Sequence, residues 1–212
     1  MELILVRHGL PLTVERVDGA PANPALSELG HAQALAVAAH LGSESIDRIY
    51  SSHLQRAHQT ALPLAETLGL EVELEPRVAE YDRDSQVYVP LEELRERDYQ
   101  AWLDFMSRGY PDGMDLDDFR RDVLAGMEDI IAANPGGRVV VFCHGGVINT
   151  WASHVIGLGF KLFFNPDYTS VNRFLAAGGS GVRSVGSLNE RAHLRAVTPG
   201  GARKSHQSAA ST

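Results

Sequence analysis

The chain has 212 residues, of which 44% are hydrophobic and 22% are charged, a composition typical of a globular protein. Its net charge of −8 argues against nucleic acid or an anionic membrane as a partner of the whole surface. Cys143 is the single cysteine, which excludes an internal disulfide, and the apolar run after Glu2 is too short for a signal sequence or a membrane span, so we expect a cytoplasmic protein.

The first predicted elements are a buried strand and a helix. Residues 3–6 form a continuous apolar run between turn-forming residues, which predicts a strand buried on both faces. Ser27 is the expected N-cap of a helix that stops at Gly42. The apolar positions predicted to form the buried face of this helix are Leu29, Ala32, Leu35, Ala36 and Ala39.

The alternation of strand and helix continues to residue 75. Residues 46–51 predict a second short strand, and the apolar spacing from Leu54 to Gly69 predicts a second helix. Residues 71–75 alternate between apolar and polar side chains and predict a weak strand. This rhythm is typical of an α/β sheet.

Residues 81–119 interrupt the rhythm. They are rich in acidic side chains, and residues 91–106 have a helical pattern. An insertion of this kind in a regular α/β unit is either a functional lid or an elaborated packing element, and we favour a lid. Besides Phe119 at its end, the insertion contains six aromatic residues: Tyr81, Tyr88, Tyr99, Trp102, Phe105 and Tyr110.

The last third of the chain returns to strands. Residues 139–143 predict a second strongly buried strand, and an apolar helix follows from Gly145. Residues 170–177 and 182–188 resemble a pair of late strands joined by glycines. Residues 199–212 have the composition of a disordered tail.

Polar side chains gather where these strands end, which is the edge at which open α/β sheets bind ligands. Arg7 and His8 end the first strand, Arg56 lies in the first turns of the second helix, and His144 ends the late buried strand. Glu80 follows the weak third strand. Two arginines, two histidines and two helix N-termini directed at one crevice predict a site for a dianion.

Simpler interpretations exist for single members of this set. His8 alone would be a satisfied core histidine, and an arginine such as Arg56 alone would be solvated. A metal site is not expected, because no His-x-His, Cys-x-x-Cys or His-Glu-x-x-His spacing occurs and the arginines would repel a divalent ion. Cys143 should face away from His144 on the strand, so we expect a small buried hydrophobic residue rather than a nucleophile.

With these residues in view, the chain resembles the histidine phosphatase superfamily, in its phosphoglycerate mutase-like branch. The motifs that carry the resemblance are LVRHG (5–9), PALSELGHAQA (24–34), SSHLQRAHQTA (51–61), Glu80 and VVVFCHGGVI (139–148). We therefore expect a three-layer α/β/α sandwich with a mostly parallel central sheet. It would form one domain over residues 1–198, with the insertion at about 81–119 as a lid over the carboxyl ends of the strands.

The resemblance also implies a role for each residue of the site. His8 would be the nucleophile that attacks phosphorus and gives a phosphohistidine. Arg7, Arg56 and His144 would hold the phosphoryl oxygens and stabilise charge during transfer. Glu80 would protonate the leaving oxygen and later deprotonate the attacking water.

The chain departs from the branch just after its first motif. Members often carry polar residues where this chain has Leu10, Pro11 and Val14. Either the phosphate pocket is less polar than in relatives, or Thr13 substitutes for the missing contacts. We count Thr13 and Gly145 among the expected substrate-binding residues.

The expected function is that of a phosphatase that hydrolyses small phosphorylated metabolites without metal or cofactor. The sequence leaves open whether the protein forms a homodimer. The alternatives are a phosphoglycerate mutase-type phosphomutase and a catalytically weak phospholigand-binding protein. The segment after Glu80, residues 81–86, lacks the sequence typical of cofactor-dependent mutases, which disfavours the mutase. Aromatic residues in the lid hint at an organic group packed against rings, and Asp82 and Asp84 would disfavour extra phosphates.

Overall fold

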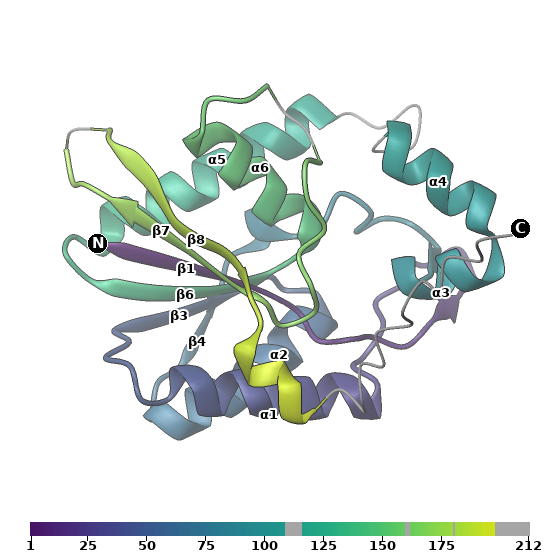
Figure 1. Cartoon of the computed structure of the whole chain (residues 1–212), viewed down its shortest axis with the longest axis horizontal. Helices are drawn as coiled ribbons and strands as arrows, with labels where there is room; N and C mark the ends of the chain where they lie inside the picture. Colours follow the sequence, from purple (N-terminus) through teal and green to yellow (C-terminus); the bar gives the residue numbers. More distant parts are fainter. Residues whose placement is uncertain (109–115, 160–161, 180, 198–212) are drawn as a thin grey trace, which may run out of the picture.

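A six-stranded sheet forms the centre of the computed structural model, which describes residues 1–108, 116–159, 162–179 and 181–197 (Figure 1). The strands are β1 (Glu2–Arg7), β3 (Arg48–Ser51), β4 (Val72–Leu74), β6 (Arg138–Cys143), β7 (Val171–Ala176) and β8 (Arg183–Glu190). They lie in the order β4-β3-β6-β1-β7-β8. The first four of these are parallel, whereas β7 and β8 pair antiparallel. The predicted mostly parallel sheet is confirmed.

Helices cover both faces of this sheet. They are α1 (Glu28–Leu41) and α2 (Gln55–Leu68) on one face, and α5 (Leu116–Ala133) and α6 (Gly145–Val155) on the other (Figure 1). Leu3 and Leu5 of β1 pack with α5 and α6, while Ile4 and Val6 pack with α1 and α2. Because both faces are covered, β1 needs apolar residues at each of the positions 3–6. The predicted three-layer architecture is confirmed.

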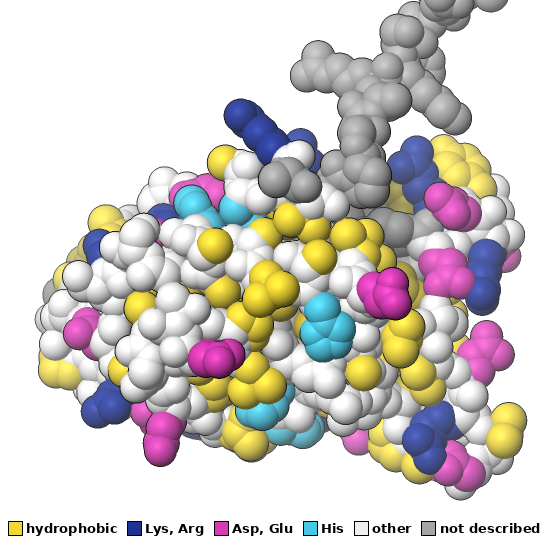
Figure 2. Space-filling model, turned by 90° about the horizontal axis from the view of Figure 1, so that it is seen from below, with side chains coloured by type: hydrophobic (Ala, Val, Ile, Leu, Met, Phe, Trp, Pro, Cys, Tyr) yellow, Lys and Arg dark blue, Asp and Glu magenta, His cyan; other side chains and the backbone are white. Residues whose placement is uncertain are grey.

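Helix α1 has the predicted extent but a different buried face. The Ser27 hydroxyl accepts a hydrogen bond from the Gly30 N–H, and the helix ends before Gly42. Leu29 and Leu35, predicted to be buried, are exposed. The inward residues are Gly30, Gln33, Ala34, Val37, Ala38 and Leu41. Apolar side chains occur all round α1, so their spacing could not distinguish its faces. Figure 2 views the molecule from the side on which α1 lies and shows hydrophobic side chains scattered over that surface.

The insertion contains two helices rather than the one predicted over residues 91–106. The side chain of Asp98 accepts a hydrogen bond from the Ala101 N–H at 3.0 Å, so Asp98 ends the first helix and caps the second. The sequence pattern did not predict α5, the paired strands β2 (Val14–Glu15) and β5 (Val87–Tyr88), or two 3-10 turns. The smaller elements are β2 (Val14–Glu15), β5 (Val87–Tyr88), α3 (Leu91–Arg97), α4 (Tyr99–Arg108) and two 3-10 turns at Pro76–Val78 and Ala192–Ala196.

The remaining strands and helices agree with the sequence prediction to within a few residues. Helix α2, for example, ends at Gly69, whose φ of 67° lies in the left-handed region that favours glycine. The predicted disordered tail, residues 199–212, lies outside the described residues. Within the described ranges, no helix has the length and apolar character needed to cross a membrane.

Candidate active site

His8 follows directly on β1 and is held by rigid neighbours. Strand β1 pairs with β6 on one side and β7 on the other, and the His8 N–H donates to the Cys143 carbonyl at 2.9 Å. The next residue, Gly9, passes so close to α1 that a Cβ there would lie 2.6 Å from the Gly30 carbonyl oxygen. Only glycine permits this approach, which fixes the backbone on both sides of His8.

The His8 imidazole is in the form of a nucleophile. Its Nδ1 lies 2.8 Å from the Gly9 carbonyl oxygen. A carbonyl can only accept, so Nδ1 carries the proton and Nε2 keeps its lone pair. Burial, followed by the charges of Arg56 and Arg7, holds the pKa of His8 well below its usual value. His8 is therefore neutral at neutral pH.

Arg7 is positioned by the segment that follows α6. Its Nη1 donates to the Pro166 carbonyl at 2.6 Å. Its guanidinium carbon lies 3.9 Å from the centre of the Tyr168 ring, a cation–π contact. These two contacts hold the guanidinium at the cavity wall next to His8.

Arg56 reaches the same cavity from the first turn of α2. Its Nη2 lies 3.3 Å from the Asp82 carboxylate, and its guanidinium carbon lies 4.5 Å from the centre of the Tyr88 ring. Its Nε is buried with no hydrogen-bond partner among the described residues. A buried guanidinium with a free donor is suited to bind an anion such as a phosphoryl group.

His144 lies beside His8, with 5.1 Å between the ring centres, at the N-cap of α6. Its Nε2 is 2.9 Å from the Ser52 hydroxyl, and its buried Nδ1 has no partner in the described part of the chain. Burial, followed by the charge of Arg56, holds the pKa of His144 well below its usual value. His144 is therefore neutral and contributes hydrogen bonding rather than charge.

Glu80 is a buried carboxyl group anchored by backbone N–H groups. One oxygen accepts from the Gly146 N–H at 2.9 Å and the other from the Tyr81 N–H at 3.1 Å. Burial, reinforced by the neighbouring charge of Asp82, raises the pKa of Glu80 to about 7, against the opposing effect of these hydrogen bonds and of Arg56. Such a carboxyl group is balanced between donating and accepting a proton near neutral pH.

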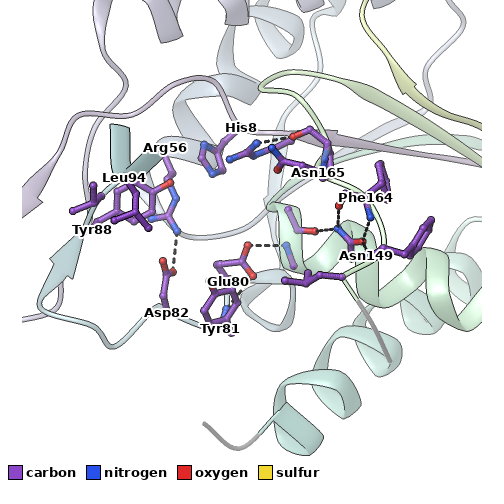
Figure 3. Close-up of a pocket in the computed structure, with 17 residues that line it drawn as sticks. His8, Arg56, Glu80, Tyr81, Asp82, Tyr88, Leu94, Asn149, Phe164 and Asn165 are labelled. Atoms are coloured by element: carbon purple, nitrogen blue, oxygen red, sulfur yellow. Dashed lines mark hydrogen bonds and ion pairs between the residues drawn. The ribbon is translucent and has the colours of Figure 1, made fainter. Parts of the chain in front are cut away.

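These side chains meet at one cavity of about 370 Å³ (Figure 3). The predicted residues that line it are Arg7, His8, Arg56, Glu80 and Gly145. His144 does not line the cavity but lies against His8. Of the two helix N-termini predicted to face the crevice, α6 contributes Gly145 and Gly146, whereas α2 contributes only the Arg56 side chain.

Thr13 is not brought into this cavity, contrary to the expectation that it contacts substrate. It lines a separate surface hollow together with Leu10 and Pro11, and its hydroxyl donates to Glu93. Val14, in the strand β2, does not line the cavity either. The apolar residues after the first motif therefore do not make the phosphate-binding end less polar.

Sequence reasoning missed two hydroxyl groups that support the site. Thr60 accepts a hydrogen bond from the Gly9 N–H at 3.0 Å and donates to the Arg56 carbonyl at 2.6 Å. Ser52 contacts His144, as described above, and accepts from the Leu54 N–H at 3.2 Å. Both residues lie in the motif at residues 51–61, and this membership is the signal in the sequence that could have identified them.

The aromatic residues of the insertion divide into two groups. Tyr81 and Tyr88 line the cavity. Tyr99 and Trp102 stack on each other at 5.6 Å and do not line it. The side chains of Phe105 and Tyr110 lie outside the described part of the chain. Among the described rings of the insertion, Tyr81 and Tyr88 are therefore the ones placed to contact a bound organic group.

The described residues offer little for metal or thiol chemistry. No group of three or more His, Cys, Asp or Glu side chains in these ranges could hold a metal ion. Cys143 is fully buried, and burial raises the pKa of its thiol, in agreement with the predicted hydrophobic role.

Comparison with known proteins gives consistent similarities. Residues 3–186 match the model of the histidine phosphatase superfamily (branch 1). A bifunctional protein of Mycobacterium tuberculosis is 32% identical over 192 residues, which cover 86% of this chain and 53% of that protein, so this chain spans about half the length of that relative. A probable phosphoglycerate mutase of Yersinia pestis is 28% identical over 165 residues, 74% of this chain and 76% of that protein.

Solved structures share the fold over most of the chain. A mycobacterial glucosyl-3-phosphoglycerate phosphatase has a TM-score of 0.70 at 22% identity, covering 90% of this chain and 99% of that one. A phosphoserine phosphatase of Entamoeba histolytica, in complex with 3-phosphoglyceric acid, has a TM-score of 0.70 at 24% identity, covering 91% of this chain and 98% of that one.

Proposed function

Because the chain belongs to the histidine phosphatase superfamily (branch 1), we propose that it is a phosphatase that hydrolyses small phosphorylated metabolites through a phosphohistidine, without a metal ion. The observation that carries the proposal is a neutral His8 fixed beside Arg7 and Arg56 in a cavity that also holds the carboxyl group of Glu80. The proposed setting is the cytoplasm, since a chain with Cys143 as its single cysteine gains no internal disulfide from an oxidising compartment.

In the first step, the lone pair on His8 Nε2 attacks the phosphorus atom. The new N–P bond forms as the bond from phosphorus to the ester oxygen breaks, and protonated Glu80 gives its proton to that oxygen, so the alcohol leaves neutral. Arg7, Arg56 and the Gly145 N–H at the start of α6 are the proposed partners of the phosphoryl oxygens.

In the second step, water attacks the phosphohistidine. Glu80, now ionised, takes a proton from the water as the new O–P bond forms and the N–P bond breaks. Inorganic phosphate leaves, His8 recovers its lone pair, and Glu80 is protonated again. A pKa of about 7 suits Glu80 to both steps.

One observation favours a phosphomutase as a second candidate, namely the 28% identity to a probable phosphoglycerate mutase. A mutase would return the phosphoryl group from His8 to another hydroxyl of the substrate instead of to water. Isotope transfer between the positions of a phosphoglycerate, without release of inorganic phosphate, would favour it. The binding-protein alternative draws on the apolar residues Leu10, Pro11 and Val14 at places where relatives are polar, and none of the three lines the cavity.

The test of the proposed function combines turnover with trapping. Assayed against a panel of phosphorylated metabolites, the protein should release inorganic phosphate from at least one of them. Quenching during turnover should trap an acid-labile phosphoenzyme, as expected for a phosphohistidine. A protein that binds these compounds but gives neither phosphate nor phosphoenzyme would refute the proposal.

Removal of divalent metal ions is expected to leave turnover unchanged. The proposed chemistry places positive charge with Arg7 and Arg56 and uses no metal-bound water. The measurement is the rate of phosphate release before and after dialysis against a chelator. A loss of activity that added Mg²⁺, Mn²⁺ or Zn²⁺ restores would contradict the metal-independent mechanism.

Asp82→Asn is expected to move the alkaline limb of the pH profile to lower pH. The charge of Asp82 helps to raise the pKa of Glu80, so its removal lowers that pKa, and the proton needed for the leaving oxygen is lost earlier as pH rises. The measurement is kcat/KM between about pH 5 and 9. Asp84→Asn is the matched control, because the Asp84 side chain is 88% exposed. An unchanged limb in Asp82→Asn would show that Asp82 does not tune Glu80.

A further inference from the structure

Charged and apolar side chains share the wall of the cavity. Arg7 and Arg56 supply positive charge beside the neutral His8, and apolar side chains lie on both sides of this cluster, with Tyr88 and Leu94 next to Arg56 (Figure 3). We call the apolar part of the lining the apolar wall. Its residues come from the insertion and from the segment after α6. Its residues are Tyr88, Val89, Leu94, Leu162, Phe163 and Phe164.

The half of the apolar wall that follows α6 is anchored to the site itself. The side chain of Asn149, on α6, donates to the Phe164 carbonyl at 2.9 Å and accepts from the Phe163 N–H at 3.0 Å. It also donates to the Gly145 carbonyl at 3.0 Å. One buried amide thus holds two aromatic residues in fixed relation to the residue that begins α6 (Figure 3).

The described part of the lining has no further cation for a second anionic group. Arg7 and Arg56 are the described cations that line the cavity. Arg7 donates to the Pro166 carbonyl, and Arg56 is paired with Asp82. The other charged groups in the described lining are carboxyl groups, Glu80 and Asp82. A carboxylate or second phosphate on the substrate would lie near these groups and would lose hydration without gaining a partner.

Given the phosphatase activity proposed above, we infer that the substrate is a phosphomonoester whose phosphate is its only anionic group and whose alcohol is apolar. A cavity of about 370 Å³ lies at the small end of the range for ligand sites, which suits an alcohol with one or two rings or a branched alkyl chain. The phosphate binds between Arg7, His8 and Arg56, and the alcohol packs on the adjoining apolar wall.

The test compares three phosphates of primary alcohols, so that the reactivity of the leaving group is matched. They are 2-phenylethyl phosphate, glycerol 3-phosphate and 3-phosphoglycerate. We expect kcat/KM for 2-phenylethyl phosphate to exceed that for glycerol 3-phosphate by about 10-fold or more, and that for 3-phosphoglycerate by about 100-fold. The polar alcohol separates the effect of apolar contact from the effect of the second charge.

Leu94→Ala tests the apolar wall directly. It should lower kcat/KM for 2-phenylethyl phosphate by about 10-fold and change that for glycerol 3-phosphate little, because only the former loses contact. Leu103→Ala is the matched control, since Leu103 lies on α4 and does not line the cavity. A damaged fold would lower both rates and the midpoint of thermal unfolding, which distinguishes it from a lost contact.

The outcomes separate this inference from the proposed function. If 3-phosphoglycerate or glycerol 3-phosphate is hydrolysed as well as 2-phenylethyl phosphate, the inferred substrate class is wrong and the phosphatase proposal stands. An equal loss for both substrates in a folded Leu94→Ala variant would also overturn it. If no phosphomonoester is hydrolysed and no phosphoenzyme can be trapped, the proposed function itself fails.

Discussion

Turnover of a phosphomonoester should fall by roughly 10⁴-fold or more when His8 is replaced by alanine. The proposed phosphoryl acceptor is His8 Nε2, and no other described side chain in the cavity offers a neutral nitrogen with a free lone pair. The arginines and backbone N–H groups remain, so the variant should still bind phosphate. The measurements are kcat/KM on 2-phenylethyl phosphate and the amount of acid-labile phosphoenzyme, both of which should vanish.

A matched variant distinguishes the loss of the nucleophile from damage to the fold. His31→Ala removes an exposed histidine on α1 and should leave turnover unchanged. The midpoint of thermal unfolding for His8→Ala should confirm that the sheet is intact, because β1 keeps its pairing with β6 and β7. A folded His8→Ala variant with near wild-type turnover would exclude the phosphohistidine mechanism.

The carboxyl edge of the sheet could be predicted from sequence because its physical causes are local. Apolar runs at 3–6 and 139–143 have to be buried on both faces, which places both strands in the interior of the sheet, where they pair. The residues at the carboxyl ends of such strands meet at one edge, so the sequence predicts that Arg7, His8 and His144 lie together. The observed contact between the two histidine rings follows from that topology.

Other features could not be predicted because they depend on contacts between distant segments. The face that α1 buries depends on its fit against α2 and the sheet, and its apolar residues lie all round the helix. The environment of Thr13 depends on where the insertion places Glu93. In the sequence, Asn149 resembles any polar helix residue. Its role depends on the return of the chain near residue 163, where backbone groups form hydrogen bonds with both the nitrogen and the oxygen of its amide.

The pKa of Glu80 is likewise a product of the fold. The sequence predicts a carboxyl group near the site, but Glu80 has to be distinguished from the rest of the 27 acidic residues in the chain. Burial distinguishes Glu80 from the rest and raises its pKa, and the backbone N–H groups of Tyr81 and Gly146 orient its oxygens. A general acid with these properties should have an effect that depends on the alcohol it protonates.

Glu80→Gln is therefore expected to lower kcat/KM for 2-phenylethyl phosphate by about 10²- to 10⁴-fold, because the alkoxide cannot leave without a proton. The loss should be much smaller for p-nitrophenyl phosphate, whose phenolate is a stable leaving group. The second step still needs Glu80 as a base, so kcat for p-nitrophenyl phosphate should fall more than kcat/KM. A burst of nitrophenol and an accumulated phosphoenzyme are the signatures to measure.

The pH profile gives an independent check on the same residue. In the wild-type protein kcat/KM for 2-phenylethyl phosphate should decline as pH rises through about 7, where Glu80 loses the proton that the ester oxygen needs. Glu80→Gln cannot titrate, so this alkaline limb should be absent from its profile on the same substrate. Glu66→Gln, an exposed change on α2, should keep the wild-type profile. If Glu80→Gln slows the two esters equally and keeps the limb, the proton comes from another group, and Glu80 acts only by holding the start of α6 through the Gly146 N–H.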